Sequence, residues 1–250
     1  MTYLELQASF ELEINKIDAN LEKPKSVDIE YWLNRGLEKF YKTRYTGVNV
    51  KGLGFEQDQK RIDDLRTLIS VKSFDLDRSY NIVQEKPSAS EGNKILIDDS
   101  WLELEQSWDK IYKVEKNGFA VRLPKDYVVL LGDQASIEPT RAEDIQCAEK
   151  DEDGNIIPWT DDTIEATIET IDKQLRNSLS EHRIKYNRAR PSRLIRHNTI
   201  TLYTDNNYDI VKYNIHYLRR PKEIDIHKDP RGQYEDMPEH THYEIVKLAV

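Results

Sequence analysis

The last sixteen residues of the chain, EDMPEHTHYEIVKLAV, hold two histidines one residue apart among carboxylates, and all of these side chains can bind metal ions. Asp236 followed three positions later by Glu239 has the pattern of a capping box, which predicts that a helix begins here, with Pro238 in its first turn. On a helix, His240 and His242 lie about 200° apart around the axis, whereas helical metal pairs use i, i+4 spacing. The sequence therefore favours a helix N-terminus over a metal site, with an inward face of Ile245, Val246, Leu248 and Ala249.

A second set of possible ligands, Asp151, Asp153 and Asn155, has the alternating spacing with which a calcium loop begins. An EF-hand loop also needs glycine at its sixth position and glutamate at its twelfth, where this chain has Ile156 and Asp162. A polar hairpin turn fits the segment better, because the Asp-Gly pair within it tolerates the backbone dihedrals of a tight turn. We therefore expect no calcium site.

The other residue types that could do chemistry are scattered. The single cysteine, Cys147, lies among carboxylates that disfavour its thiolate, so we expect a buried structural thiol and no internal disulfide. The glycines at 52 and 54 lack the remaining glycine of a dinucleotide fingerprint, and no phosphate-binding loop motif occurs. Because no set of residues supplies a nucleophile, a base and an orienting group, the sequence predicts neither an enzyme nor a bound cofactor.

Charge is distributed unevenly along the chain. The net charge of −9 argues against binding nucleic acid over the whole surface, because such binding needs cations along the phosphates. Residues 132–172 contain 13 acidic side chains against two basic ones, whereas residues 182–197 contain six basic side chains and no acidic one. We interpret these blocks as solvated faces, as one intramolecular pairing, or as the two sides of a head-to-tail contact between copies. The candidate interface residues are Arg183, Lys185, Arg188, Arg190, Arg193 and Arg196 on the basic side and Glu149, Asp151 and Asp153 on the acidic side.

Three amphipathic helices are predicted in the first part of the chain. Thr2 and Glu5 have capping-box spacing, Ser26 can cap a second helix, and a third is expected from about Glu56 to Ser70. Their inward faces are expected to hold Leu6, Phe10, Ile14 and Ile17, then Ile29, Trp32, Leu33, Leu37, Phe40 and Tyr41, then Ile62, Leu65, Leu68 and Ile69.

Short apolar runs bounded by turn residues predict strands after these helices. Pro124 is expected to open a short helical turn that Gly132 closes, and Asn206-Asn207 is expected to form a turn. In the last predicted strand, His216 should face away from the core. The runs are SYNIVQEK, KILID, GFAVRLP, RLIRH, TITLYTD and YDIVKYNIHYLRRP.

The segment from Asp162 to His182 is predicted as the clearest helix of the chain. Asp162 and Glu165 have capping-box spacing, and apolar residues recur at helical spacing after them. Its inward face would hold Ile164, Ile168, Ile171, Leu175 and Leu179.

The predicted fold class is α+β, in which an amphipathic helical layer of N-terminal and C-terminal helices accompanies a β-rich part with one long inserted helix. The domains expected are an N-terminal helical region over residues 1–73, a β-rich region over residues 74–234 with the inserted helix around 162–182, and a C-terminal helix over residues 235–250 that packs on the helical region.

Composition favours an oligomer. Hydrophobic residues make up 38% of the chain and charged residues 33%, a balance that suits a subunit whose apolar patches are completed by neighbouring copies. The first residues lack the pattern of a signal peptide, and no stretch approaches the ~20 apolar residues of a membrane span. We therefore expect a soluble chain made in the cytoplasm, without a membrane partner.

Several blocks of the sequence resemble the neck ring proteins of crAss-like tailed bacteriophages of gut bacteria. The blocks together span most of the chain and are DIEYWLNRGLEKFYKTRY, GFEQDQKRIDDLRTLI, LPKDYVVLLGD, TIETIDKQLRNSLSEHRIKYNRARP, YNIHYLRRP and MPEHTHYEIVKLA. The layout of helices, strands and a C-terminal helix is also similar to that of the head-tail adaptors of short-tailed phages.

The resemblance implies a structural protein of the virion, without catalytic residues. It implies a homo-oligomeric ring of twelve copies in the phage neck, which joins the portal protein to further neck or tail proteins. It also implies a conduit through which DNA passes without sequence-specific binding. Two other classes stay open at this point: a non-ring DNA-packaging or DNA-binding accessory factor that uses the basic block 182–197, and a hydrolase with a metal or nucleophile site.

Overall fold

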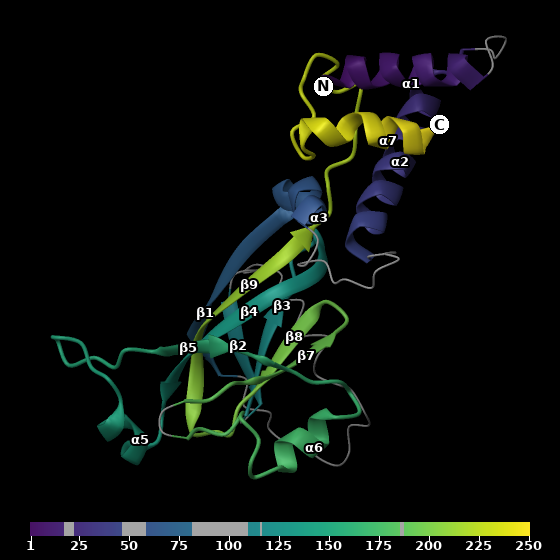
Figure 1. Ribbon diagram of the computed structural model, residues 1–250. Helices are drawn as coiled ribbons and strands as arrows, with labels where there is room; N and C mark the ends of the chain where they lie inside the picture. Colours follow the sequence, from purple (N-terminus) through teal and green to yellow (C-terminus); the bar gives the residue numbers. More distant parts are fainter. Residues whose placement is uncertain (18–22, 47–58, 82–109, 116, 186–187) are drawn as a thin grey trace, which may run out of the picture. The chain divides into compact units, whose positions relative to one another are not determined.

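The computed structural model describes residues 1–17, 23–46, 59–81, 110–115, 117–185 and 188–250. The chain forms two compact units (Figure 1). The helical unit comprises residues 1–70 and 219–250, and the strand unit comprises residues 71–218. Residues 219–234, which the sequence pattern grouped with the strands, thus lie with the helices in this division.

The helical unit contains four described α-helices: α1 (Tyr3–Ile17), α2 (Ser26–Thr46), α3 (Gln59–Leu65) and α7 (His242–Ala249). Short 3-10 turns follow α3 at Arg66–Leu68 and precede α7 at Glu239–Thr241. The predicted capping box before α1 is confirmed: the Thr2 backbone N–H donates to Glu5 at 2.8 Å, and the Glu5 N–H donates to the Thr2 hydroxyl at 3.2 Å.

Helix α7 packs against α1 and α2. The closest approach is at Gly36 of α2, where a Cβ atom would lie 2.7 Å from the Cβ of Ala249 and 2.7 Å from the Ile245 carbonyl oxygen. A glycine is therefore needed for the two helix backbones to come this close. The apolar faces meet in a core of Leu6, Phe10, Ile29, Leu33, Leu37, Phe40, Ile245 and Val246, each at most 3% exposed.

The inward faces agree with the sequence prediction in their central residues and depart from it at their edges. Trp32 of α2 is 50% exposed and Ile17 of α1 is 71% exposed, although both were expected to be buried. The third helix is shorter than the expected 56–70: it ends at Leu65 and turns through the 3-10 segment into a strand. The first residues of that prediction, 56–58, lie outside the described residues.

Nine described strands form one sheet in the order β5-β4-β9-β1-β2-β3-β8-β7-β6. The two strands at its ends, β5 and β6, are consecutive in the chain and separated only by Thr163. A single residue can join them only if the sheet curls until its two edges meet, so the sheet is a nearly closed barrel. The strands are β1 (Ile69–Asn81), β2 (Lys110–Glu115), β3 (Gly118–Arg122), β4 (Tyr127–Pro139), β5 (Trp159–Asp162), β6 (Ile164–Glu165), β7 (Ser192–Arg196), β8 (Thr199–Tyr203) and β9 (Tyr208–Arg219).

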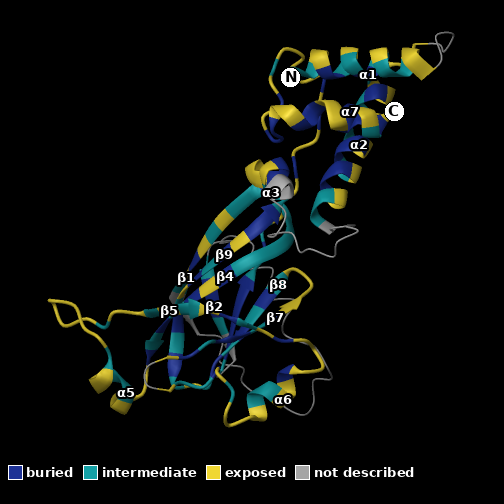
Figure 2. Ribbon diagram, viewed as in Figure 1, coloured by how far each residue is buried: buried dark blue, intermediate teal, exposed yellow. Residues whose placement is uncertain are grey.

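The barrel is filled by the inward side chains of its strands (Figure 2). Along β9, Tyr213, Ile215 and Tyr217 are buried while Lys212 and His216 are exposed, which confirms the predicted alternation from residue 212 onward and the outward direction of His216. Val211, which was also expected on the core side, is only half-buried. The turn before β9 is also confirmed, since Asn206 has the positive φ of 70° that asparagine tolerates. The main core contains Phe74, Ile111, Phe119, Val121, Ala135, Ile137, Ile200, Leu202, Tyr208 and Ile210, among others.

The α+β class is confirmed, but the long inserted helix is not present. Residues 159–165 are strands β5 and β6, and the described helix of this segment is the short α6 (Ile171–Arg176). The helix-like face was misleading, because Ile168 and Leu179 are 67% and 77% exposed. Residues 159–165 pair with β4 and β7 in the sheet instead, and tertiary context of this kind overrides a local pattern.

The start of α6 has its own local signal, a pair of threonines. The Thr167 N–H donates to the Thr170 hydroxyl at 2.9 Å, and the Thr170 N–H donates to the Thr167 hydroxyl at 3.3 Å. This reciprocal pair takes the place of the capping box predicted from Asp162 and Glu165, which both lie in strands.

The predicted helical turn from Pro124 to Gly132 is also wrong. One tight turn forms, in which the Tyr127 N–H donates to the Pro124 carbonyl at 3.1 Å, and β4 then runs as a strand through Gly132. The β-branched and aliphatic residues after the turn favour extended backbone, and the glycine does not end the strand. The strand predicted for KILID, and the end of the one predicted for SYNIVQEK, lie outside the described residues.

Candidate functional site

A buried carboxylate lies where the two ends of the sheet come together in the barrel. Asp133 of β4 is 7% exposed and accepts hydrogen bonds from the Tyr213 hydroxyl at 2.6 Å and from the Thr163 hydroxyl. Arg193 of β7 completes the group, with its Nη1 atom 2.5 Å from the carboxylate. Thr163 is the residue that joins the two edge strands, β5 and β6. The contacts of Asp133 therefore stabilise the barrel at its seam, the place where these two edges meet.

The electrostatics of this cluster favour a fixed structural role. Burial, together with the neighbouring Asp133 carboxylate, raises the pKa of Tyr213 well above its usual value, so its hydroxyl stays a hydrogen-bond donor. A buried ion pair is costly to break, since removing one partner leaves the other charge without compensation. Arg193, predicted as an interface residue, is thus mostly buried inside its own chain.

Two more residues of the basic block are also used within the chain. Arg190 forms an ion pair with Glu181 at 2.9 Å and donates to the Asp162 carbonyl at 3.1 Å. Arg183 donates to the carbonyl oxygens of Leu175 and Asn177, each at 3.2 Å, and so caps the C-terminal end of α6. Together with Arg193, three of the six predicted interface cations therefore make contacts within their own chain.

The other half of the block is exposed. The Lys185 ammonium donates to the Leu179 carbonyl at 3.2 Å, and the Arg188 guanidinium stacks over the Trp159 ring at 4.5 Å. Arg196, at the end of β7, is exposed as well. Among the residues that the structure describes, none of these three cations has a carboxylate partner.

The acidic block divides in the same way. Asp133 and Glu165 lie 2.5 and 3.7 Å from Arg193, while Glu149 and Asp153 are exposed without a described cation partner. Within the described chain, the structure thus contains part of the intramolecular pairing that the sequence left open, and it brings neither Glu149 nor Asp153 to the basic block.

The predicted polar turn at residues 151–155 is confirmed, although the flanking hairpin is minimal. Asp151 accepts hydrogen bonds from the backbone N–H groups of Asn155 at 2.7 Å and Asp153 at 3.1 Å. The hydrogen bond from the Asn155 backbone, followed by that from its side chain, lowers the pKa of Asp151. Gly154 has a φ of 84°, and one isolated bridge joins Lys150 to Ile156.

Cys147 is exposed, which corrects the prediction of a buried thiol. It is the last residue of α5 (Ala142–Cys147). The sequence predicted a hairpin over residues 144–159, but residues 144–147 belong to this helix instead. Helix α5 has no buried residue, so it offers no hydrophobic core in which the Cys147 thiol could be buried.

His240 and His242, the two histidines considered above as metal ligands, bind different partners. The His240 Nε2 donates to Asp64 at 3.0 Å, while the His242 Nε2 donates to the Met237 carbonyl at 2.9 Å. Asp64 also forms an ion pair with Arg44, whose Nε atom lies 2.8 Å from the carboxylate. No cluster of three or more His, Cys, Asp or Glu residues able to hold one metal ion occurs among the described residues.

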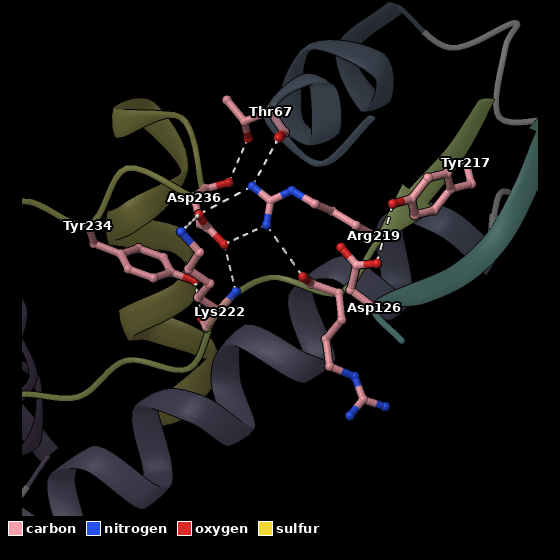
Figure 3. A network of polar contacts seen from close by, with 8 residues as sticks. Thr67, Asp126, Tyr217, Arg219, Lys222, Tyr234 and Asp236 are labelled. Atoms are coloured by element: carbon pink, nitrogen blue, oxygen red, sulfur yellow. Dashed lines mark hydrogen bonds and ion pairs between the residues drawn. The ribbon is translucent and has the colours of Figure 1, made fainter. Parts of the chain in front are cut away.

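Asp236 does not cap the terminal helix, contrary to the sequence prediction. Figure 3 shows its carboxylate bound by the Arg219 guanidinium, at 2.8 and 3.2 Å, and by the Lys222 backbone N–H at 2.6 Å. Burial raises the pKa of Asp236, but these hydrogen bonds and charges outweigh burial, so the pKa lies below its usual value. Helix α7 is instead preceded by a 3-10 turn in which the Thr241 hydroxyl donates to the Pro238 carbonyl.

A shallow hollow of about 530 Å³ lies at the β6–β7 edge of the barrel. Its apolar side chains are Ala166, Ile168, Leu194 and Ile195, and its polar ones are Glu165, Thr167, Glu169 and Arg193. These residues do not combine a nucleophile with a base, and the hollow is open, so it has the character of a contact surface.

The residues that sequence reasoning missed are Asp133, Thr163 and Tyr213. Each belongs to a different part of the chain, and no local pattern links them. The available signal was the aspartate that follows the apolar run YVVLLG, but this run was expected to form a helical turn. Only as a strand does it bring the Asp133 carboxylate into the barrel, where it needs a buried partner.

No protein family matches the chain, and no curated protein matches it either. In the described part of the chain, no helix is both long and apolar enough to cross a bilayer.

Proposed function

We propose that this protein is a structural subunit of a bacteriophage neck, in which copies form a closed ring. The ring joins the portal protein to the tail and forms part of the conduit through which DNA leaves the head. The proposal starts from the sequence blocks that resemble phage neck ring proteins. These blocks include residues that hold each unit together: Asp133 and Tyr213 in the barrel, and Arg219 in the helical unit.

The observation that carries the proposal is the set of large apolar side chains left exposed on the helical unit. On α2, Val27 is 65%, Tyr31 56% and Trp32 50% exposed. Val27 and Tyr31 are four residues apart and so lie on one face, and the Tyr31 and Trp32 rings contact edge to face at 5.3 Å. Aromatic residues grouped in this way are enriched at protein interfaces.

Exposed apolar residues also occur on the neighbouring helix. Leu4 and Leu12 of α1 are 47% and 62% exposed, and their spacing of eight residues places them on one face of the helix. Burying a side chain of this size is worth about 1.5–3 kcal/mol, so covering several of them favours association strongly. A subunit that is always part of an assembly can keep such residues at its surface, and a ring gives each copy two neighbours.

The charge of the chain is consistent with a conduit. Duplex DNA is held by cations that displace its counterions, and a channel through which DNA slides must not hold it tightly. A chain with a net charge of −9 meets this requirement better than a basic one.

The alternative of a DNA-binding accessory factor receives less support from the structure. It needs the basic block to present a continuous cationic surface to phosphates. Arg193 is buried against Asp133, Arg190 pairs with Glu181, and Arg183 binds carbonyl groups, so three of the six cations are already used. For the alternative of a metal-dependent hydrolase, no group of three or more possible metal ligands occurs among the described residues.

The experiment that tests the proposal is localisation of the chain in intact virus particles. Gold-labelled antibodies against the purified protein should bind at the junction of head and tail in electron micrographs, once the particles are opened mildly. Labelling of the capsid surface or of the distal tail, or no labelling of purified particles, would reject a neck subunit.

A further inference from the structure

A long arm projects from the strand unit between β4 and β5. The two strands pair in antiparallel fashion, with Ile137 opposite Trp159, so a hairpin loop of two to five residues would be enough to connect them. The chain instead uses residues 140–158, all of them described, and none of these residues is buried (Figure 2). Connections of this length without a core of their own are uncommon and are usually functional.

The arm is nonetheless ordered by its own contacts. It contains α5, the Asp151 turn, and a hydrogen bond at 2.9 Å from the Ile157 N–H to the Glu149 carbonyl. Because the backbone of the arm is already ordered, burying its side chains against a partner costs little further conformational entropy.

The surface of the arm combines negative charge with one large exposed aliphatic group. It has six acidic and two basic residues. Glu149, Glu152 and Asp153 are exposed, with no cation partner in the described chain, and Ile157 is 49% exposed. Its partner should therefore offer a cation next to an apolar hollow.

The same chain offers such a surface on the other side of its barrel. In Figure 1, β7, β8 and α6 lie on the opposite side of the strand unit from α5 of the arm. The hollow at the β6–β7 edge is lined by residues 165–169, which precede α6, and by residues 193–195 of β7. Arg196 is exposed at the end of β7, next in the chain to Ile195. Ile195 and Ile168, which both line the hollow, are 38% and 67% exposed. The rim also carries two carboxylates: Glu165, which lies 3.7 Å from an Arg193 that is already paired with Asp133, and Glu169, which has no cation partner in the described residues.

We infer that the arm of one copy docks on the β7–β8 turn and the adjacent hollow of the next copy, with Arg196 facing the acidic residues of the arm and Ile157 facing the hollow. A donor on one side of the barrel and an acceptor on the other give a head-to-tail contact, which is the kind of contact that closes into a ring. Arg188 is a poorer acceptor, because it stacks on Trp159 of β5, the strand at which the arm ends. The inference deepens the proposed function and rests on it, since it assigns the contact between ring subunits.

Crosslinking tests the contact directly, because Cys147 is the only cysteine of the chain and lies exposed on the arm. The variant Asn198→Cys adds a second thiol in the β7–β8 turn, and a flexible bismaleimide should join the two thiols between copies into a ladder of multimers. Cys147→Ser combined with Asn198→Cys should abolish the ladder. As a matched control, Lys16→Cys on the exposed surface of α1 should give no ladder with Cys147.

Native mass measurement on the same samples separates this inference from the proposed function. A ring without the ladder would overturn the arm contact and leave the ring intact. A ladder from open chains that never close would support the arm contact and contradict the ring. The absence of both would overturn both.

Charge reversal gives an independent test. Glu149→Lys with Asp153→Lys should weaken association between copies roughly tenfold, and adding Arg196→Glu should restore much of it. Glu169→Lys should strengthen association, because it replaces a rim carboxylate that has no described cation partner by a cation. Glu223→Lys with Glu235→Lys makes the same change of charge on the helical unit and should have little effect. Equal weakening by both lysine pairs, without rescue, would contradict the contact.

Discussion

Replacement of Asp133 by asparagine tests the buried cluster at the seam of the barrel. The asparagine keeps the size of the side chain and an oxygen for the Tyr213 and Thr163 hydroxyls, but it removes the charge 2.5 Å from Arg193. The Arg193 side chain is only 12% exposed. Its other carboxylate partner, Glu165, is 3.7 Å away and 79% exposed, so Glu165 compensates the Arg193 charge only weakly.

The expected magnitude follows from the cost of leaving a buried charge unpaired. Removing one partner of a buried ion pair costs about 3–5 kcal/mol, and the remaining hydrogen bonds place Asp133→Asn near the lower end. For a domain of this size, about 3 kcal/mol corresponds to a decrease in Tm of roughly 6–12 °C. The assay is thermal unfolding followed by circular dichroism, with all variants at one protein concentration because association also stabilises the chain.

Two control variants make the measurement specific. Asp153→Asn changes an exposed carboxylate of the arm and should shift Tm by no more than about 1 °C. Asp133→Asn combined with Arg193→Met removes both charges and should recover at least half of the lost stability, because no buried charge is then left unpaired. If Asp133→Asn shifts Tm as little as Asp153→Asn does, the seam is not stabilised by this ion pair.

Three further predictions follow from other contacts. Gly36→Ala should destabilise the helical unit by about 1–3 kcal/mol in urea unfolding, because the added Cβ would lie 2.7 Å from that of Ala249; an unchanged midpoint would mean that the helices can move apart freely. Burial, followed by the nearby Arg183 charge, lowers the pKa of His182, so the unfolded chain binds a proton more readily and stability should fall as pH decreases below about 6.5. His182→Gln should reduce this fall while His216→Gln, at an exposed position of β9, should not; equal pH profiles for both would refute the assignment. Trp32→Ser should weaken association of the copies by tenfold or more in sedimentation experiments. The Tm of the separated chain should change little, because the Trp32 side chain is already 50% exposed there.

Local patterns predicted the elements whose signals are contained within a few residues. The reciprocal Thr2 and Glu5 cap, the turn at Asn206, and the alternation along β9 depend only on neighbouring residues and on the two-residue period of a strand. These features form as expected because no distant partner competes for the same groups.

Predictions failed where distant partners decide the outcome. The segment after Asp162 has helical spacing, but pairing of β5 with β4 and of β6 with β7 places it in the barrel instead. Asp236 has the position of a cap, but Arg219, seventeen residues earlier in the chain, binds it more strongly than a helix N-terminus would. A capping pattern therefore predicts a cap only when no arginine reaches the same carboxylate.

The candidate site was predicted in part. The charge blocks were visible in the sequence, but their division into paired and unpaired residues was not. Arg193 and Arg196 are three positions apart, but only Arg193 has a buried carboxylate partner among the described residues, while Arg196 is exposed at the end of β7. That partner, Asp133, is sixty residues earlier in the chain and is brought to Arg193 by the folding of the barrel, which no local pattern specifies.

Native mass measurement of the purified protein, combined with electron micrographs of the same particles, tests whether its copies form a closed ring. We expect a single closed species whose mass is a whole multiple of the 29.5 kDa protomer, twelvefold by the resemblance, with a central hole in end-on views. A stable monomer at all concentrations, or a compact particle without a hole, would contradict it.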